Sequence, residues 1–223
     1  MKKNLTAVLI VMSSLLFAQD SLKMKNAFFT VNPEKVITKQ TAGINVGVLD
    51  LYKKQKINGV NIQANPITLL YPLFPKTVEA PSKSESTVSI NGLHVSTGGM
   101  LDGEKLNGLG ISAYHHCRVT NGVSFNFFNN TSNILNGFHV SGFSNDSQIG
   151  SGVTAAVLGN YSSDFKGLQI SVYNQSKKLR GVQIGLINKS ENLKGIQIGL
   201  WNVNEKRKFP IINWNFKAKT QKP

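Results

Sequence analysis

The chain has 223 residues and a formal net charge of +14 at pH 7, with 25 Lys and Arg against 11 Asp and Glu. This length allows one domain with a buried core or an extended array of repeats. Cys117 is the only cysteine, which excludes an internal disulfide, so stability has to come from packing and backbone pairing.

The first 18 residues predict a secretory signal peptide. Lys2 and Lys3 precede an uncharged apolar run from Leu5 to Ala18, and polar residues follow at once. This layout is typical of an export signal, and the apolar run is too short to cross a bilayer comfortably. We therefore expect an exported chain that is located at the cell surface, in the outer membrane or in the periplasm.

A glycine-led unit repeats along most of residues 19–216, which we predict to form a single β-repeat domain. Neighbouring units are 14 to 16 residues apart, except for one double step of 33 residues. Self-similarity at a fixed period predicts a repeat architecture. The phased glycines are Gly43, Gly59, Gly92, Gly108, Gly122, Gly137, Gly152, Gly167, Gly181 and Gly195.

The residues after each glycine alternate between apolar and polar. The first and third positions are apolar in every unit and the second is polar or small, as in Ile196, Gln197 and Ile198. An alternation with period two indicates a β-strand that is buried on one face. We therefore predict that the apolar positions form the core and that Gln183 and Gln197 belong to an outward ladder. We also expect a bend at the glycine to turn inward the apolar residue two positions before it, such as Leu193.

Two all-β architectures satisfy this pattern. In a β-solenoid each unit is one coil and equivalent residues stack, whereas in an antiparallel meander or β-barrel each unit is one strand and a turn. Repeated Gln and Asn at equivalent positions favour the solenoid, because parallel in-register stacking places like residues beside each other. The period also suits an outer-membrane barrel. We prefer the β-solenoid and keep the antiparallel meander or β-barrel as the alternative.

The units GVQIGLIN and GIQIGLWN and the closing FPIINWNF resemble a bacterial family of surface repeat-containing proteins. The resemblance is strongest over residues 165–216 and weakens toward the N-terminus. It implies an exported, surface-associated β-repeat protein with no assigned reaction, and it supplies no catalytic residue.

Two segments depart from the repeat. Residues 65–86 contain four prolines and predict a loop outside the sheet, because proline removes a ladder donor. This loop is interpreted either as a flap over an edge or end of the core, or as an exposed apolar patch that docks a partner or membrane. At the C-terminus, an atypical last unit predicts a cap built by Phe209, Pro210, Trp214 and Phe216. A basic disordered tail is expected at 217–223.

Positive charge is concentrated near the C-terminus. Residues 164–223 hold 12 Lys and Arg against 3 Asp and Glu. This surplus predicts contact with anionic lipid, lipopolysaccharide or acidic glycan, and no nucleic acid is expected as a partner of an exported chain. The alternative is that these cations only keep the sheet soluble and protect its edge. The candidate contact residues are Lys166, Lys177, Lys178, Arg180, Lys194, Lys206, Arg207 and Lys208.

The sequence predicts no catalytic residue, metal site or cofactor. His115, His116 and Cys117 form the only cluster of metal-capable residues, but an extended strand would send the two histidines to opposite faces. His94 and His139 are too scattered to complete a site, so we expect turn and surface histidines. No base or orienting acid stands near Cys117 in a recognisable catalytic pattern, and GVQIGLIN lacks the spacing of a dinucleotide fingerprint.

These observations favour a non-enzymatic, exported β-repeat protein that acts as a scaffold or as a binding surface for anionic envelope components. An integral outer-membrane β-barrel or small pore is the alternative. A metal- or ligand-binding enzyme built around residues 114–117 is a third hypothesis.

Overall fold

The computed structural model describes residues 27–31, 39–48, 55–66 and 79–216. The predicted signal peptide and the predicted basic tail lie outside this described part. Within it, the strands form one 12-stranded sheet in which spatial neighbours follow chain order. The strands are β1 (Ala27–Val31), β2 (Lys39–Val48), β3 (Gln55–Ala64), β4 (Val88–Ser96), β5 (Gly99–Ser112), β6 (Tyr114–Asn126), β7 (Asn129–Ser141), β8 (Ser144–Ala156), β9 (Gly159–Ile170), β10 (Tyr173–Ile184), β11 (Ile187–Val203) and β12 (Lys208–Asn215).

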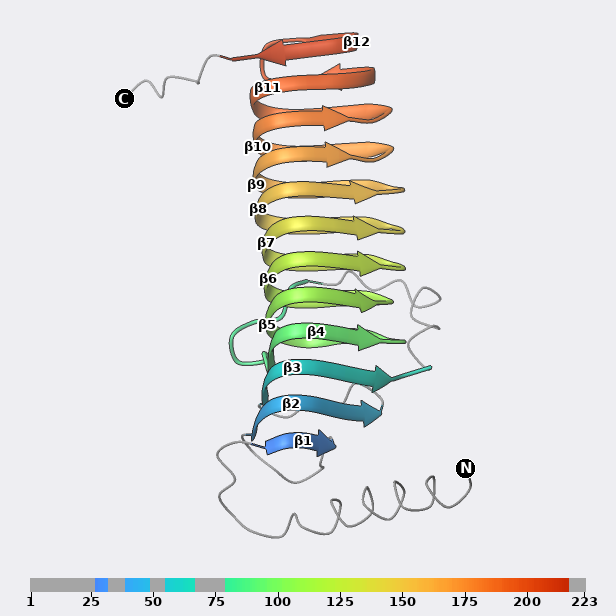
Figure 1. The fold of residues 1–223 in the computed structure, drawn as a ribbon. Coiled ribbons are helices and arrows are strands. Elements are labelled where there is room, and N and C mark those ends of the chain that lie inside the picture. Colours follow the sequence, from blue (N-terminus) through green and yellow to red (C-terminus); the bar gives the residue numbers. More distant parts are fainter. Residues whose placement is uncertain (1–26, 32–38, 49–54, 67–78, 217–223) are drawn as a thin grey trace, which may run out of the picture.

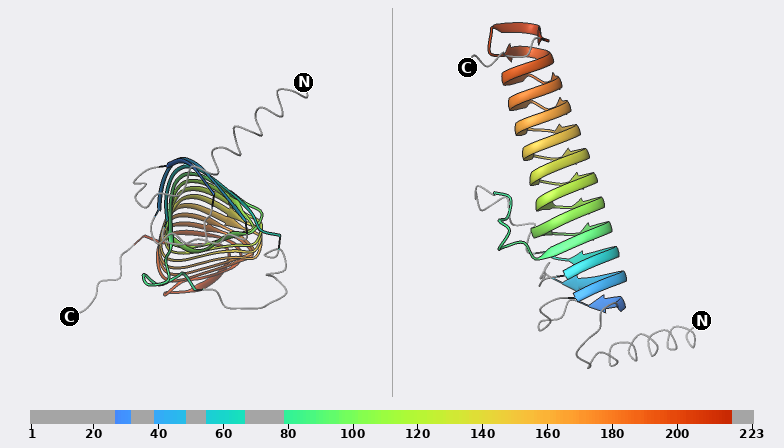
Figure 2. Two further views of the ribbon diagram at one scale, coloured as in Figure 1. Left: turned by 90° about the horizontal axis from the view of Figure 1, so that it is seen from below. Right: turned by 90° about the vertical axis from the view of Figure 1, so that its left-hand side faces the viewer.

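The strands from β1 to β11 are coils of a β-solenoid. Each pairs in parallel with the next, and equivalent residues of the repeat face one another, as in Gly167, Gly181 and Gly195. Figure 1 shows the coils stacked into a rod, and Figure 2 shows that each coil has a triangular outline. The preferred prediction of a β-solenoid is confirmed, and parallel pairing excludes the antiparallel meander or barrel for these strands.

The repeated glycines stand where the backbone has to bend while the coils remain in contact. At Gly152 the backbone has a φ of +106°, a conformation that side chains rarely allow. A Cβ atom built on this glycine would lie 2.1 Å from the carbonyl oxygen of Gly137 in the preceding coil. Glycine is therefore required at this corner both by its backbone angle and by the coil beneath it.

The predicted assignment of the inner and outer faces was wrong for the residues that follow each glycine. Gln183 and Gln197 are fully buried inside the solenoid, whereas Ile184 and Ile198 are 39% and 41% exposed. The column two residues before the glycine, which includes Leu193, does face inward as predicted. The residues two before and two after the glycine therefore point to the same side of the backbone, and the apolar first and third positions point outward.

Stacked amides make the polar interior stable. Gln183 Nε2 donates to Gln169 Oε1 at 2.9 Å, and Gln197 Nε2 donates to Gln183 Oε1 at 2.9 Å. A side-chain amide carries both donors and an acceptor, so each rung can donate to one neighbour and accept from the other. Parallel stacking thus satisfies a buried polar column that a single strand would leave unpaired.

A second amide ladder runs along another inner edge of the solenoid. Its members are Asn145, Asn160, Asn174, Asn188 and Asn202, joined by side-chain hydrogen bonds of 2.8 to 3.0 Å. Several of these amides also bind backbone carbonyl oxygens, as Asn174 Nδ2 does to Ile184 O at 2.9 Å. The Asn column therefore closes each coil at the place where one strand ends and the next begins.

The last coil ends in a strand that runs in the opposite direction. β12 pairs antiparallel with the end of β11, and the inward side chains of this pairing are Asn213 and Asn215. The predicted cap is present, but the prediction that aromatic side chains build it was wrong: Phe209, Trp214 and Phe216 are exposed. The interior at this end is polar, so amides continue it better than aromatic rings.

The long interruption of the repeat falls between β3 and β4. Residues 67–78, which hold most of the predicted loop, lie outside the described part of the chain. The described residues that follow, 79–87, contain no strand, and Ser82 makes a compact turn with Glu85 through a 2.7 Å hydrogen bond.

Candidate binding surfaces

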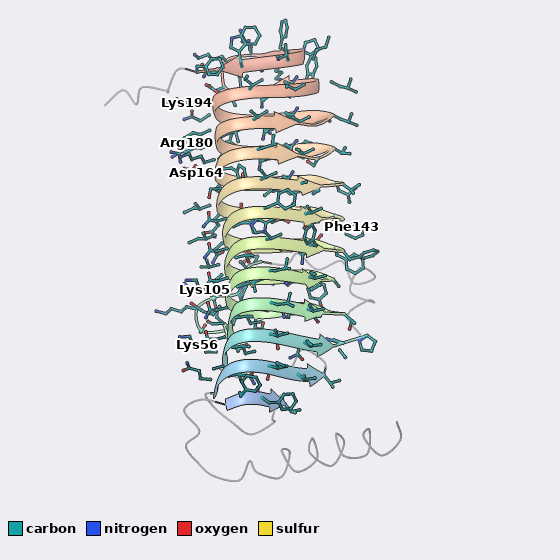
Figure 3. The ribbon with its side chains drawn as sticks, in the orientation of Figure 1. Lys56, Lys105, Phe143, Asp164, Arg180 and Lys194 are labelled. Atoms are coloured by element: carbon teal, nitrogen blue, oxygen red, sulfur yellow. The ribbon has the colours of Figure 1, made fainter. Side chains whose placement is uncertain are left out.

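Three of the predicted basic residues form one outward column. Lys166, Arg180 and Lys194 occupy the position before the corner glycine in β9, β10 and β11, and the sheet register places them directly next to one another. All three are exposed. Figure 3 shows Arg180 and Lys194 projecting from the same side of the rod. We call these three residues the basic column.

An acidic residue lies beside the basic column. Asp164 accepts a hydrogen bond from Arg180 at 3.0 Å and pairs in register with Lys178. An exposed ion pair of this kind stabilises the fold by about 0 to 1 kcal/mol. Glu205 is a second nearby carboxylate, because it accepts a hydrogen bond from the backbone N–H of Leu193 at 3.0 Å. The basic column and Lys178 together still place four cations against these two carboxylates, so this side of the solenoid remains positive.

The other predicted contact residues lie elsewhere. Lys177 lines a polar pocket, whereas Lys206, Arg207 and Lys208 belong to the C-terminal cap. Arg207 donates to Asn213 Oδ1 at 2.9 Å and lies 4.5 Å from the centre of the Trp214 ring. The structure thus groups Lys178 with the basic column and separates the remaining four candidates from it.

An apolar surface adjoins the basic column across the corner glycine. We call the outward residues at the first and third positions after each corner glycine the apolar face. These two columns contain no charged residue in any of the ten units. The more exposed members are Ile44, Ile62, Ile111, Phe125, Phe138, Ile170, Ile184 and Ile198.

The apolar face continues around the next corner of the coil. In the C-terminal coils a groove of about 620 Å³ runs between Ile170, Ile184 and Ile198 on one wall and Leu186 and Leu200 on the other. Leu200 is 70% exposed. The floor of this groove is formed by small residues, which keeps it open: Ala156, Ser171, Gly185 and Gly199.

All four histidines lie inside the solenoid, so the prediction of turn and surface histidines was wrong. His94 Nδ1 lies 2.9 Å from Asn61 Nδ2, and His139 Nδ1 lies 2.8 Å from Ser124 Oγ. His115 fills the space beside Gly110, where the other coils carry an inward side chain. His116 stacks on Tyr114 with ring centres 5.2 Å apart. These histidines continue the inner polar columns.

Burial keeps these histidines neutral. Desolvation lowers the pKa of His94 to about 4, of His116 to about 3 and of His139 to about 4. The pKa of His115 is also well below its usual value, first through burial and then through the neighbouring histidines. Among the described residues, no group of three or more His, Cys, Asp or Glu could hold a metal ion.

Cys117 is buried beside Met100, with its Sγ 3.7 Å from the thioether sulfur. Burial raises the pKa of its thiol to about 12, so almost no thiolate exists at neutral pH. We expect alkylation of the native protein by iodoacetamide to be slower than that of the urea-unfolded chain by at least about 100-fold. Mass spectrometry of the labelled protein would measure both rates. Equal rates would contradict the buried position of this thiol.

Comparison with known proteins adds no assignment to these surfaces. The chain matches no family model, no curated protein and no solved structure. No helix among the described residues is long and apolar enough to span a membrane. The candidate site therefore has to be judged from its own geometry and chemistry.

Sequence reasoning located the basic column but missed the apolar face. The sequence predicted the apolar columns correctly but assigned them to the core. Alternation shows which residues share a side of a strand, but it does not show which side is buried. The sequence contains one relevant relation: Leu193 and Gln197 are four residues apart, so they share a side of a continuous strand. If Leu193 is buried, Gln197 also faces inward, where stacked amides can bond to one another.

Proposed function

We propose that this chain is a non-enzymatic, exported scaffold that lies on an anionic lipid surface with its apolar face and its basic column. One observation carries the proposal: an uncharged apolar face continues, across a single corner of the coil, into Lys166, Arg180 and Lys194. Large exposed apolar patches mark interaction sites, because water solvates them poorly.

Charge complementarity favours anionic lipid as the partner. A membrane surface offers an apolar layer beneath a negatively charged head-group layer, and the two neighbouring surfaces of the solenoid present the matching pair. Apolar side chains bury into the head-group boundary, and each Lys or Arg near an anionic surface contributes about 1 kcal/mol. Lipopolysaccharide has the same combination of acyl chains and phosphate, whereas an acidic glycan would leave the apolar face uncovered.

Vesicle sedimentation tests this proposal. We expect the mature chain to sediment with vesicles of phosphatidylcholine and phosphatidylglycerol, and much less with phosphatidylcholine alone. The triple change Lys166→Gln, Arg180→Gln and Lys194→Gln should weaken binding by about 100-fold at low salt, from about 1 kcal/mol per cation. Raising the salt concentration should reduce the difference between this variant and the wild type.

A matched control removes three charges from another part of the molecule. Lys56→Gln, Lys83→Gln and Lys105→Gln lower the net charge by the same amount. Figure 3 shows Lys56 and Lys105 on the same side of the rod as Arg180 and Lys194 but in earlier coils, so they are separated from the basic column along the rod. This control should keep most of the binding. Equal loss in the two variants would show that net charge alone attracts the vesicles, and a wild-type chain that stays in solution at low salt would contradict the proposal.

The apolar contribution is tested separately. Ile170, Ile184 and Ile198 are exposed neighbours in one column, and their replacement by threonine keeps the β-branched shape that suits a strand. We expect this variant to lose the part of vesicle binding that persists at high salt. Export is a further part of the proposal, and cell fractionation that finds the chain in the cytoplasm would contradict it.

A further inference from the structure

A polar pocket on a different side of the solenoid has the chemistry of a saccharide site. The pocket has a volume of about 470 Å³ and lies against β7, β8, β9 and β10. Glu79 and Ala80, which precede β4 in the chain, form part of its wall. This volume lies within the range that small-molecule sites usually have, about 300 to 1,000 Å³.

The base of the pocket is an aromatic shelf. The shelf is the ring of Tyr161, which can occupy this place because Gly159 has no side chain. A Cβ atom at Gly159 would lie 2.5 Å from Cε2 and 2.6 Å from Oη of Tyr161. The Tyr161 ring therefore lies back over the glycine instead of projecting away from the coil. It is 39% exposed, and Tyr173 lies beside it with ring centres 5.9 Å apart. A flat ring with an accessible face attracts the positively polarised C–H groups of a sugar ring.

Hydrogen-bonding groups flank this shelf on neighbouring coils. Asp146 and Gln175 are the register neighbours of Tyr161 in the preceding and following coils, so they lie about 4.8 Å away on either side. Asp146 Oδ2 accepts from Ser144 at 2.6 Å, and Gln175 Oε1 accepts from Tyr173 Oη at 2.9 Å. These contacts orient the carboxylate and the amide, and no hydrogen bond from another described residue occupies the second polar atom of either.

The remaining polar groups fit hydroxyl groups better than a single charge. Gln148, Ser163 and Lys177 also line the pocket, so the lining contains both donors and acceptors. A sugar hydroxyl both donates and accepts, and it can use such a mixed lining. Asp146 and Glu79 outnumber Lys177, which disfavours the anionic ligands that the basic column would attract.

We infer that this pocket binds a short neutral oligosaccharide, stacked on Tyr161 and held by Asp146 and Gln175. The pocket spans successive coils, so Asp146, Tyr161 and Gln175 lie one coil spacing apart along the rod. This inference is independent of the proposed lipid contact, because it uses other residues. The vesicle variant at Lys166, Arg180 and Lys194 should therefore bind saccharides as the wild type does.

Calorimetric titration of the mature chain tests the inference. The probes are the neutral hexasaccharides of glucose, mannose, galactose and N-acetylglucosamine. We expect saturable binding of at least one of them. Tyr161→Ala should weaken that binding by about tenfold, because it removes the stacking surface. Gly159→Ala should weaken it to a similar extent, because the added Cβ atom displaces the ring.

Two further variants keep the test decisive. Trp201→Ala removes an exposed aromatic ring from a later coil outside the pocket, and it should leave the affinity unchanged. Gln175→Ala removes one polar partner without removing the shelf, and it replaces Tyr161→Ala if circular dichroism shows that the latter is unfolded. The inference is overturned if no probe binds, if the folded pocket variants bind as the wild type does, or if Trp201→Ala loses as much affinity.

Discussion

Replacing Gly152 with alanine is expected to lower the free energy of unfolding by at least about 3 kcal/mol. Two separate effects add at this position. The backbone φ of +106° is strained for any residue with a Cβ atom, and the new atom would lie 2.1 Å from the carbonyl oxygen of Gly137. The obstacle is backbone, so no side-chain rotation can relieve it.

Ser151→Ala is the matched control, one residue away in the same coil. It removes a hydroxyl group that donates to Asn136 Oδ1 at 2.7 Å in a half-buried outer ladder. The loss of this hydrogen bond should cost about 1 kcal/mol. Thermal and urea unfolding would compare the two variants. Equal stability of Gly152→Ala and Ser151→Ala would contradict the role assigned to the corner glycine.

Hydrogen exchange should also show which coils Gly152→Ala destabilises. Among the described strands, each coil packs against the coils on either side, so stability in such an array depends on the units and on their nearest-neighbour interfaces. Gly152→Ala is therefore expected to increase amide exchange first in β7, β8 and β9. Exchange that rises uniformly from β2 to β11 would instead show that the solenoid opens as a single cooperative unit.

Much of this fold could be predicted from the sequence because the repeat is nearly regular. Gly181 and Gly195 head two almost identical units, and identical units stack in register more readily than they alternate in direction. Which side of each strand faces the interior could not be predicted in the same way. It depends on the hydrogen-bonded Gln169, Gln183 and Gln197 ladder, which exists only once the coils are stacked.

The two candidate sites also differ in how far the sequence predicts them. The basic column follows from the repeat, since Lys166, Arg180 and Lys194 hold one position in three successive units. The saccharide pocket does not, because its aromatic shelf depends on a missing side chain at Gly159 and its wall includes Glu79, which is distant in the sequence. Features that recur with the repeat period can be predicted from the sequence. Features that occur in a single coil become apparent only in the structure.

Acidification is expected to unfold this protein because its four histidines are buried and neutral. In the unfolded chain a histidine has a pKa of about 6.5, whereas the pKa of His94 and His139 falls to about 4 inside the solenoid. Below pH 6.5 the unfolded chain therefore binds more protons than the folded chain. The stability that neutral histidines provide is complete above pH 6.5 and is lost as the pH falls toward 4.

The expected loss at pH 5 is about 2 kcal/mol for each of His94, His116 and His139, on the order of 6 kcal/mol for the three, and burial of His115 acts in the same direction. This is comparable with the total stability of many domains. Asp146 acts in the opposite direction, since burial raises the pKa of its carboxyl group and protonation then favours the folded state. Burial also raises the pKa of the Asp102 carboxyl group. Two carboxyl groups thus oppose four buried histidines, so the histidines should dominate between pH 6.5 and 5.

The double variant His94→Asn and His139→Gln tests this origin of the acid sensitivity. Asparagine precedes His94 in its inner column, at Asn61, and glutamine occupies the same column two coils beyond His139, from Gln169 onward. Both replacements are therefore amides of a kind that this column already holds. Urea unfolding at pH 7.5 and pH 5 should show a loss of stability on acidification that is smaller by about 4 kcal/mol in the variant. An unchanged loss would assign the acid sensitivity to groups other than these two histidines, because a buried imidazole that does not titrate differently in the two states cannot make stability depend on pH.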